Sequence, residues 1–184
     1  MKHGLVLIDL QNDYFPGGKM ALFNMNEAAV NARRLLDAFR KWRLPVIHVQ
    51  HFSVRPGSTF FLPESDGVEI NDLVAPEKEE TIVHKHYPNS FRETDLLDVL
   101  KDNEIEKLTV CGAMSHMCVD ATVRAAYDYG FKVSIAEDAC ATRDLMFKEI
   151  SVKATHVHAS FMAALSSPYA EVVTTEEIID RPAQ

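Results

Sequence analysis

Residues 112–124, GAMSHMCVDATVR, join a predicted strand to a predicted helix. Before them runs LTVC, residues 108–111, a short and mostly apolar segment typical of a buried parallel strand. After Cys118, apolar residues recur at helical spacing from Val119 to Tyr127. We therefore expect Cys118 at or just inside the start of a helix that follows a strand and a glycine turn.

Cys118 is a candidate nucleophile because of this position. The unpaired N–H groups at the start of a helix carry partial positive charge, which favours the thiolate form of a cysteine. The same N–H groups can bind the oxyanion that forms when sulfur attacks a carbonyl carbon. From this stretch alone, a cysteine that only packs as a small buried hydrophobe is an equal alternative.

Strands and helices alternate along the rest of the chain, which predicts a parallel sheet covered on both faces and joined by right-handed crossovers. The expected strands are residues 4–8, 46–50, 81–84, 108–111, 131–136 and 170–173. The expected helices are 26–43, 95–101, 118–130 and 144–164, of which the first is capped by Asn26 and the last by Asp144, and Gly130 ends the third. Residues 51–80 are expected to form a long loop. The predicted fold is a three-layer α/β/α domain with a Rossmann-like, six-stranded, mainly parallel sheet, in one domain over residues 1–184.

The composition narrows the possible partners and locations. The chain has 184 residues, of which 47% are hydrophobic and 25% charged, as in ordinary globular proteins. A net charge of -8 argues against nucleic acid or an anionic membrane as a partner. The apolar run at residues 4–8 is too short for a signal peptide or a membrane span. Three cysteines, an odd number, indicate reduced thiols, so we expect a cytoplasmic protein in which Cys111 and Cys140 pack in the core.

Two further charged residues directly follow predicted strands. Asp9 follows the first strand, at the carboxyl edge where ligands bind in parallel sheets. Lys85 follows the third strand. Taken singly, a loop carboxylate and a solvated lysine are the simpler interpretations.

Three segments together resemble the isochorismatase-like cysteine hydrolases. They are DLQNDYF at residues 9–15, KHYPNSF at 85–91, and GAMSHMCVDATVRAA at 112–126. This superfamily includes nicotinamidases, N-carbamoylsarcosine amidases and ureidoacrylate hydrolases. The resemblance covers nearly the whole chain, and it implies a catalytic aspartate, lysine and cysteine in this order.

The roles that the resemblance implies are chemically consistent. Asp9 accepts the proton of the Cys118 thiol, and Lys85 offsets the negative charge of both groups. The backbone amides of Met114 and Cys118 bind the oxyanion of the tetrahedral intermediate. The resemblance also implies a cis peptide bond at Ala113–Met114.

No metal and no other cofactor are expected. Nicotinamidases of the superfamily bind a metal ion through an Asp-x-His pair after the second strand and a further histidine. In this chain Gln50 and Phe52 occupy the two positions of that pair, and neither is a good ligand. The histidines that could in principle assemble another site are His48, His51, His84, His86 and His116.

The substrate is expected to be a small neutral or acyclic amide or a carbamoyl compound. Five side chains lie on loops at the expected mouth of the site, where they would line an apolar, aromatic pocket or else pack a lid or a subunit contact. These residues are Phe15, Phe52, Tyr87, His116 and Met117.

Two other functions stay open. One is hydrolysis of a vinyl ether, the reaction that gives the family its name, although this reaction does not need a cysteine nucleophile. The other is a non-catalytic oligomeric scaffold or a thiol-redox protein that uses Cys118 as a sensor. The resemblance also implies a homodimer or homotetramer.

Overall fold

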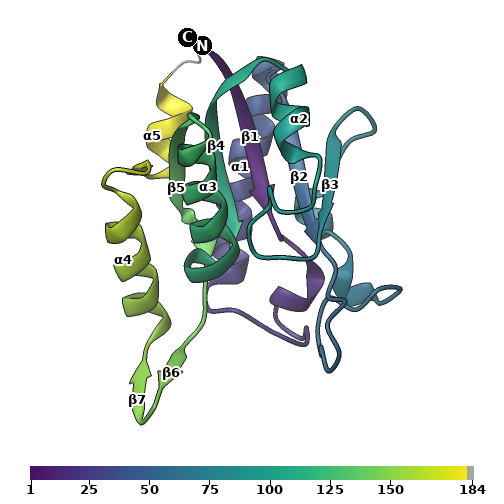
Figure 1. Ribbon diagram of the computed structural model, residues 1–184, viewed down its shortest axis with the longest axis vertical. Helices are drawn as coiled ribbons and strands as arrows, with labels where there is room; N and C mark the ends of the chain where they lie inside the picture. Colours follow the sequence, from purple (N-terminus) through teal and green to yellow (C-terminus); the bar gives the residue numbers. More distant parts are fainter. Residues whose placement is uncertain (182–184) are drawn as a thin grey trace.

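A six-stranded parallel sheet forms the centre of the computed structural model, which describes residues 1–181 (Figure 1). The strand order is β3-β2-β1-β4-β5-β8. The strands are β1 (Lys2–Ile8), β2 (Val46–His51), β3 (Thr81–Lys85), β4 (Ile105–Ala113), β5 (Lys132–Ala141) and β8 (Glu171–Val173). Every neighbouring pair in this sheet is parallel, because each connection crosses over the sheet before the next strand begins.

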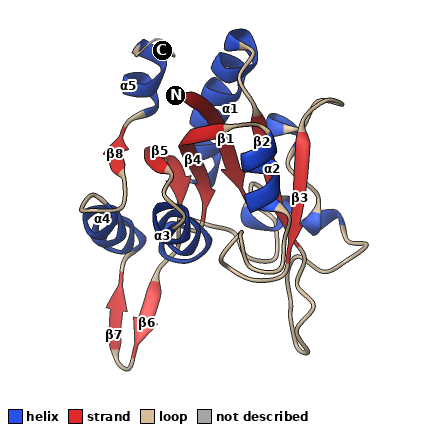
Figure 2. Ribbon diagram, turned by 45° about the horizontal axis from the view of Figure 1, so that its top comes forward, coloured by secondary structure: helices blue, strands red, loops and turns tan. Residues whose placement is uncertain are grey.

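Helices cover both faces of the sheet, as Figures 1 and 2 show. The helices are α1 (Met25–Trp42), α2 (Leu96–Asp102), α3 (Asp120–Asp128), α4 (Ala154–Leu165) and α5 (Thr175–Asp180). The apolar side chains of α1 and α5 pack on one face, and those of α2, α3 and α4 pack on the other. The predicted three-layer α/β/α fold is therefore confirmed.

The strand order places a topological switch point between β1 and β4. From β1 the chain adds β2 and β3 on one side, and from β4 it adds β5 and β8 on the other. The crossovers at such a point leave a crevice at the carboxyl ends of the two central strands. Asp9 follows β1 and the nucleophile turn follows β4, so both lie at the carboxyl ends of the central strands, where this rule expects a ligand site.

The predicted helix 144–164 is wrong over its first ten residues. A two-stranded hairpin, β6 (Leu145–Phe147) and β7 (Ile150–Val152), precedes α4 and projects from the body of the molecule (Figure 1). Lys148 at its tip has a φ of 54°, which a right-handed helix does not allow. Ile150, the first residue of β7, is 63% exposed. The capping residue of α4 is Lys153 rather than the predicted Asp144, whose Oδ1 instead accepts a hydrogen bond from the Ala154 amide at 2.8 Å across the base of the hairpin.

Other boundaries differ by less. Helix α1 begins at Met25 with Asn24 as the capping residue, so the expected cap Asn26 lies in the first turn. Helix α5 was not expected, and it begins with a capping box between Thr174 and Glu177. Within residues 1–181, no helix combines the length and the apolar character that crossing a membrane requires.

Gly112 is the glycine that the sheet requires most. It pairs with Ile8 in the sheet and has a φ of 121°, and a Cβ there would overlap the Ile8 carbonyl oxygen. We expect Gly112→Ala to lower the free energy of unfolding by about 3 kcal/mol, because backbone strain adds to a clash between two strands. Urea denaturation measures this loss.

The matched control is Gly130→Ala. Gly130 also has a positive φ, 91°, but no atom lies within 4 Å of the added Cβ. This substitution should cost about 1 kcal/mol, from backbone conformation alone. Equal losses in the two variants would contradict the proposed clash.

Candidate active site

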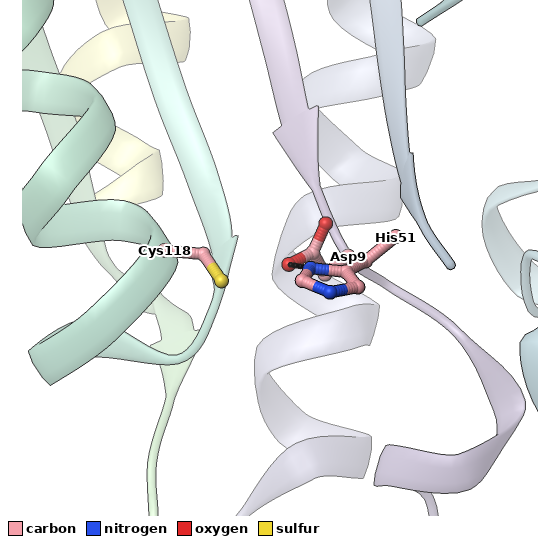
Figure 3. A group of neighbouring side chains, drawn as sticks. All are labelled: Asp9, His51 and Cys118. Atoms are coloured by element: carbon pink, nitrogen blue, oxygen red, sulfur yellow. Dashed lines mark ion pairs between the residues drawn. The ribbon is translucent and has the colours of Figure 1, made fainter. Parts of the chain in front are cut away.

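Three strands deliver three reactive side chains to one place. Asp9 follows β1 in the left-handed region, with a φ of 53°, which aspartate tolerates better than most residues. Lys85 is the last residue of β3, and Cys118 lies in the π-helical turn 115–119 between β4 and α3. The three residues are 0%, 0% and 2% exposed. Figure 3 shows the Cys118 sulfur pointing toward Asp9, with the His51 ring beside the carboxylate.

The two oxygens of Asp9 have different surroundings. Oδ2 accepts a hydrogen bond from Lys85 Nζ at 2.8 Å. Oδ1 is buried and has no hydrogen-bond partner within residues 1–181. The Cys118 sulfur, a carboxylate oxygen of Asp9 and a ring nitrogen of His51 all lie within 4.8 Å of one another. Asp9 therefore binds the ammonium group with one oxygen, and within the described residues its other oxygen is left without a hydrogen bond.

The nucleophile turn has the expected backbone. The peptide bond between Ala113 and Met114 is cis, as the sequence predicts. Within the turn, the amides of Met117 and Val119 donate to the Met114 carbonyl oxygen at 3.0 and 3.2 Å. Cys118 is thus held in the first turn of a helical segment that continues into α3.

Burial decides the charge state of the site. Burial, and then the Asp9 carboxylate, raise the pKa of the Cys118 thiol to about 12, although Lys85 opposes this shift. Loss of hydration therefore opposes the thiolate form that the helix start and the lysine favour. Burial alone would lower the pKa of Lys85, but Asp9 and Cys118 raise it above its ordinary value. Burial thus favours the neutral thiol form of Cys118, and its neighbours favour the ammonium form of Lys85.

The opening motif also anchors the long loop over the site. Gln11 is fully buried, and its Nε2 donates to the carbonyl oxygens of His51 at 2.9 Å and Val68 at 2.6 Å. Asp13 Oδ2 accepts a hydrogen bond from the Phe61 amide at 2.6 Å. The sequence linked the opening motif, residues 9–15, only to catalysis, and these contacts give it a structural role as well. The polar residues after Asp9 hold loop 51–80 against the ends of β1 and β2.

Three of the predicted substrate residues pack against neighbouring side chains. Phe15 is 9% exposed and belongs to the core beneath α1. Phe52 packs edge-on against His84, with ring centroids 5.0 Å apart. The Tyr87 ring lies under the guanidinium of Arg92, 3.8 Å from its centroid. Their contact with a substrate stays a prediction.

The other two predicted substrate residues lie in the nucleophile turn. His116 Nδ1 forms a hydrogen bond with Thr142 Oγ1 at 2.6 Å, whereas Met117 is 40% exposed. A cavity of about 370 Å³ nearby is lined by Cys140 and Thr142 but by neither residue of this pair. Cys140 itself is 8% exposed, in keeping with a packing role.

Sequence reasoning missed two side chains near the reactive groups. Tyr14 is 2% exposed, and burial, then Cys118 and Asp9, raise the pKa of its phenol. Arg143 influences the pKa of both Tyr14 and His116, and its buried Nε has no hydrogen-bond partner within residues 1–181. Tyr14 is part of the opening motif, which was the available signal, whereas nothing local marks Arg143.

The residues that could hold a metal ion already surround a cation. Asp9, His51 and Cys118 are the residue types that bind zinc. However, Lys85 Nζ lies 2.8 Å from Asp9 Oδ2 and 3.0 Å from His51 Nδ1. Gln50, at a position of the nicotinamidase metal pair, instead donates to the Val68 carbonyl oxygen at 3.0 Å. The ammonium group thus takes the place that a metal ion would need, and a metal-free enzyme stays our prediction.

Comparisons with known proteins agree along nearly the whole chain. A family model described as isochorismatase domain matches residues 3–177. The isochorismatase family protein YddQ of Bacillus subtilis is 50% identical over 97% of this chain and 99% of its own length. Streptothricin hydrolase of Streptomyces noursei is 32% identical over 95% of this chain and 66% of its own length. A crystal structure from Oleispira antarctica, assigned to the isochorismatase hydrolases, is 49% identical, with a TM-score of 0.94 over 97% of this chain and 96% of that one.

Proposed function

The chain belongs to the isochorismatase family of hydrolases, and from this premise we propose that it hydrolyses a C–N bond of a small-molecule amide or carbamoyl compound through a thioester on Cys118. The proposal rests on the different contacts that the two carboxylate oxygens of Asp9 make. One oxygen holds the Lys85 ammonium at 2.8 Å, and the other is buried and free to accept a proton. A general base needs such a free oxygen within reach of the thiol.

The first half of the reaction forms the thioester. As Cys118 Sγ attacks the carbonyl carbon, its proton passes to Asp9 Oδ1 and the carbonyl oxygen becomes an oxyanion. In this proposal the backbone amides of Met114 and Cys118 bind that oxyanion. The C–N bond then breaks, and Asp9 returns the proton to the departing nitrogen, so ammonia or an amine leaves.

The second half releases the product. Asp9 takes a proton from a water molecule, whose oxygen attacks the thioester carbon. The C–S bond breaks, the carboxylic or carbamic acid leaves, and the proton on Asp9 returns to the sulfur. Lys85 stays an ammonium throughout and offsets the negative charge that moves between Asp9 and Cys118.

The raised pKa of Cys118 is compatible with this chemistry. A thiol with a pKa of about 12 is protonated at neutral pH, so the proton must move during attack rather than before it. A neutral thiol beside an ionised Asp9 is a resting state that needs no buried thiolate. The free-energy cost of removing the thiol proton is then offset only when the substrate is bound and its carbonyl carbon can accept the electron pair of the sulfur.

The surroundings of the trio suit a small substrate with polar groups. Asp9, Lys85 and Cys118 are almost fully buried, which leaves little room for a large molecule. Arg143 Nε and His116 Nε2 are buried and have no hydrogen-bond partner in residues 1–181. Buried nitrogens without partners are costly, so we propose that they bind polar atoms of the substrate. The five predicted substrate residues and the homo-oligomeric state belong to the same proposal.

Trapping the thioester tests the function directly. The protein is mixed with a panel of small primary amides and N-carbamoyl compounds, quenched in acid and digested for peptide mass spectrometry. We expect a substrate-dependent acyl adduct on the peptide that contains Cys118, together with release of ammonia or an amine. Turnover without any adduct on Cys118, or hydrolysis of a vinyl ether in place of every amide, would reject the proposal.

A further inference from the structure

The Lys85 ammonium has a nitrogen partner that the Asp-Lys-Cys set does not include. Lys85 Nζ lies 3.0 Å from His51 Nδ1, almost as close as its 2.8 Å contact with Asp9 Oδ2. Its other contacts are longer, at 3.2 Å to the Tyr87 carbonyl oxygen and 3.5 Å to that of Pro88. An ammonium group can donate three hydrogen bonds. By distance, His51 Nδ1 is the second-closest acceptor of Lys85 Nζ, after Asp9 Oδ2.

This contact determines the protonation state of the His51 ring. An ammonium group can only donate, so Nδ1 must be the unprotonated nitrogen and the proton must lie on Nε2. Burial, opposed by Asp9 and assisted by Lys85, lowers the pKa of His51 to about 4. The charged or titratable groups near the ring are Asp9, Cys118, Lys85, His86 and Arg55. His51 is therefore a neutral acceptor at neutral pH.

Hydrogen bonds to both the amide and the carbonyl group of His51 fix the position of its ring. The His51 amide donates to Gln11 Oε1 at 2.7 Å, and the His51 carbonyl oxygen accepts from Gln11 Nε2 at 2.9 Å. The ring packs against Phe61, with centroids 5.9 Å apart, and the Phe61 amide is itself held by Asp13. The opening motif therefore positions His51 as well as the loop.

We propose that His51 is a positioning residue that holds the Lys85 ammonium between Asp9 and Cys118 by accepting one of its hydrogen bonds. This inference rests on the function proposed above. Without the acceptor, the ammonium group keeps Asp9 and the two carbonyl oxygens, which draw it toward Tyr87 and Pro88. A displacement of about 1 Å at a catalytic group lowers rates by on the order of 10²-fold.

The test compares two substitutions that differ in the acceptor. His51→Leu keeps an apolar side chain against Phe61 but removes the acceptor, whereas His51→Asn can place its amide oxygen near the position of Nδ1. We expect His51→Leu to lower kcat by about 10²-fold with little change in KM, and His51→Asn to recover most of that loss. His86→Leu is the matched control, because His86 is exposed and its ring contacts the Phe52 carbonyl oxygen instead of the lysine.

A second readout needs no substrate. The rate at which iodoacetamide alkylates Cys118 is measured from pH 6 to pH 11 in each folded variant, with thermal unfolding as the check of folding. In His51→Leu the rise of that rate should move to higher pH, because the displaced ammonium stabilises the thiolate less, whereas His51→Asn and His86→Leu should follow the parent protein. A purely structural role would change the melting temperature and leave this profile unmoved, which would overturn the inference.

Nitrogen NMR of the parent protein separates this inference from the proposed function. We expect the His51 ring to be neutral with its proton on Nε2 at pH 7. A proton on Nδ1, or a charged ring, would overturn the inference even if Cys118 is the nucleophile. If the ring is as expected, but no amide acylates Cys118, the proposed function fails while the His51–Lys85 contact stands.

Discussion

Replacement of Cys118 by alanine is expected to lower kcat for the best amide substrate by on the order of 10⁴-fold or more, because no other group can form the thioester. The other cysteines cannot take over this role. Cys111 is fully buried within β4, and among the described residues the cysteine that groups closely with Asp9 and His51 is Cys118. Release of ammonia or an amine, measured under saturating substrate, gives the comparison.

Two further variants complete this test. Asp9→Asn should lose activity to a similar degree, because its amide cannot accept the thiol proton at the position of Oδ1. Cys111→Ala should keep activity within about threefold, since it removes one core sulfur and no reacting group. Full activity in Cys118→Ala would reject covalent catalysis, whereas an equal loss in Cys111→Ala would point to a folding defect.

Replacement of Lys85 by methionine is expected to lower the free energy of unfolding by about 3 to 5 kcal/mol, the usual loss when one partner of a buried ion pair is removed. Lys85 and Asp9 are both 0% exposed and form a hydrogen bond of 2.8 Å. Methionine fills a similar volume but leaves the Asp9 carboxylate buried without its cation. Urea denaturation at pH 7 measures the loss.

The double variant Asp9→Asn/Lys85→Met is the control for this explanation. The double variant removes the buried, unpaired charge of Asp9, so it should be more stable than Lys85→Met alone while remaining inactive. If the double variant is instead less stable by the sum of the two single losses, the ion pair is not the cause. A stability of Lys85→Met equal to that of the parent protein would contradict the buried pair itself.

Hydrophobic periodicity predicted most of the fold, because it is a local property of each segment. The runs at residues 4–8 and 46–50 became β1 and β2, and residues 26–43 became α1 within one residue at either end. The same reasoning failed at residues 144–153. There the apolar spacing of α4 extends toward the N-terminus beyond the helix itself. No local sequence signal indicates that the chain turns a hairpin at Lys148.

The candidate site was partly readable in the same way. Asp9 and Lys85 each directly follow a predicted strand, Cys118 lies in the turn after another, and the carboxyl ends of parallel strands meet at one edge. His51 was considered only as a possible metal ligand, and Arg143 was not considered. Their roles depend on contacts between residues far apart in the chain, such as the 3.0 Å approach of His51 to Lys85.

By itself the sequence determined most of the order of strands and helices, the class of fold and the candidate trio, because each is encoded in short segments with their own periodicity or motif. Only the tertiary structure decided which oxygen of Asp9 is free, that His51 contacts the ammonium group, and that the Cys118 thiol is protonated at rest with a pKa of about 12. The physical reason is that a charge state depends on dehydration and on neighbouring charges, which exist only once distant segments have packed together.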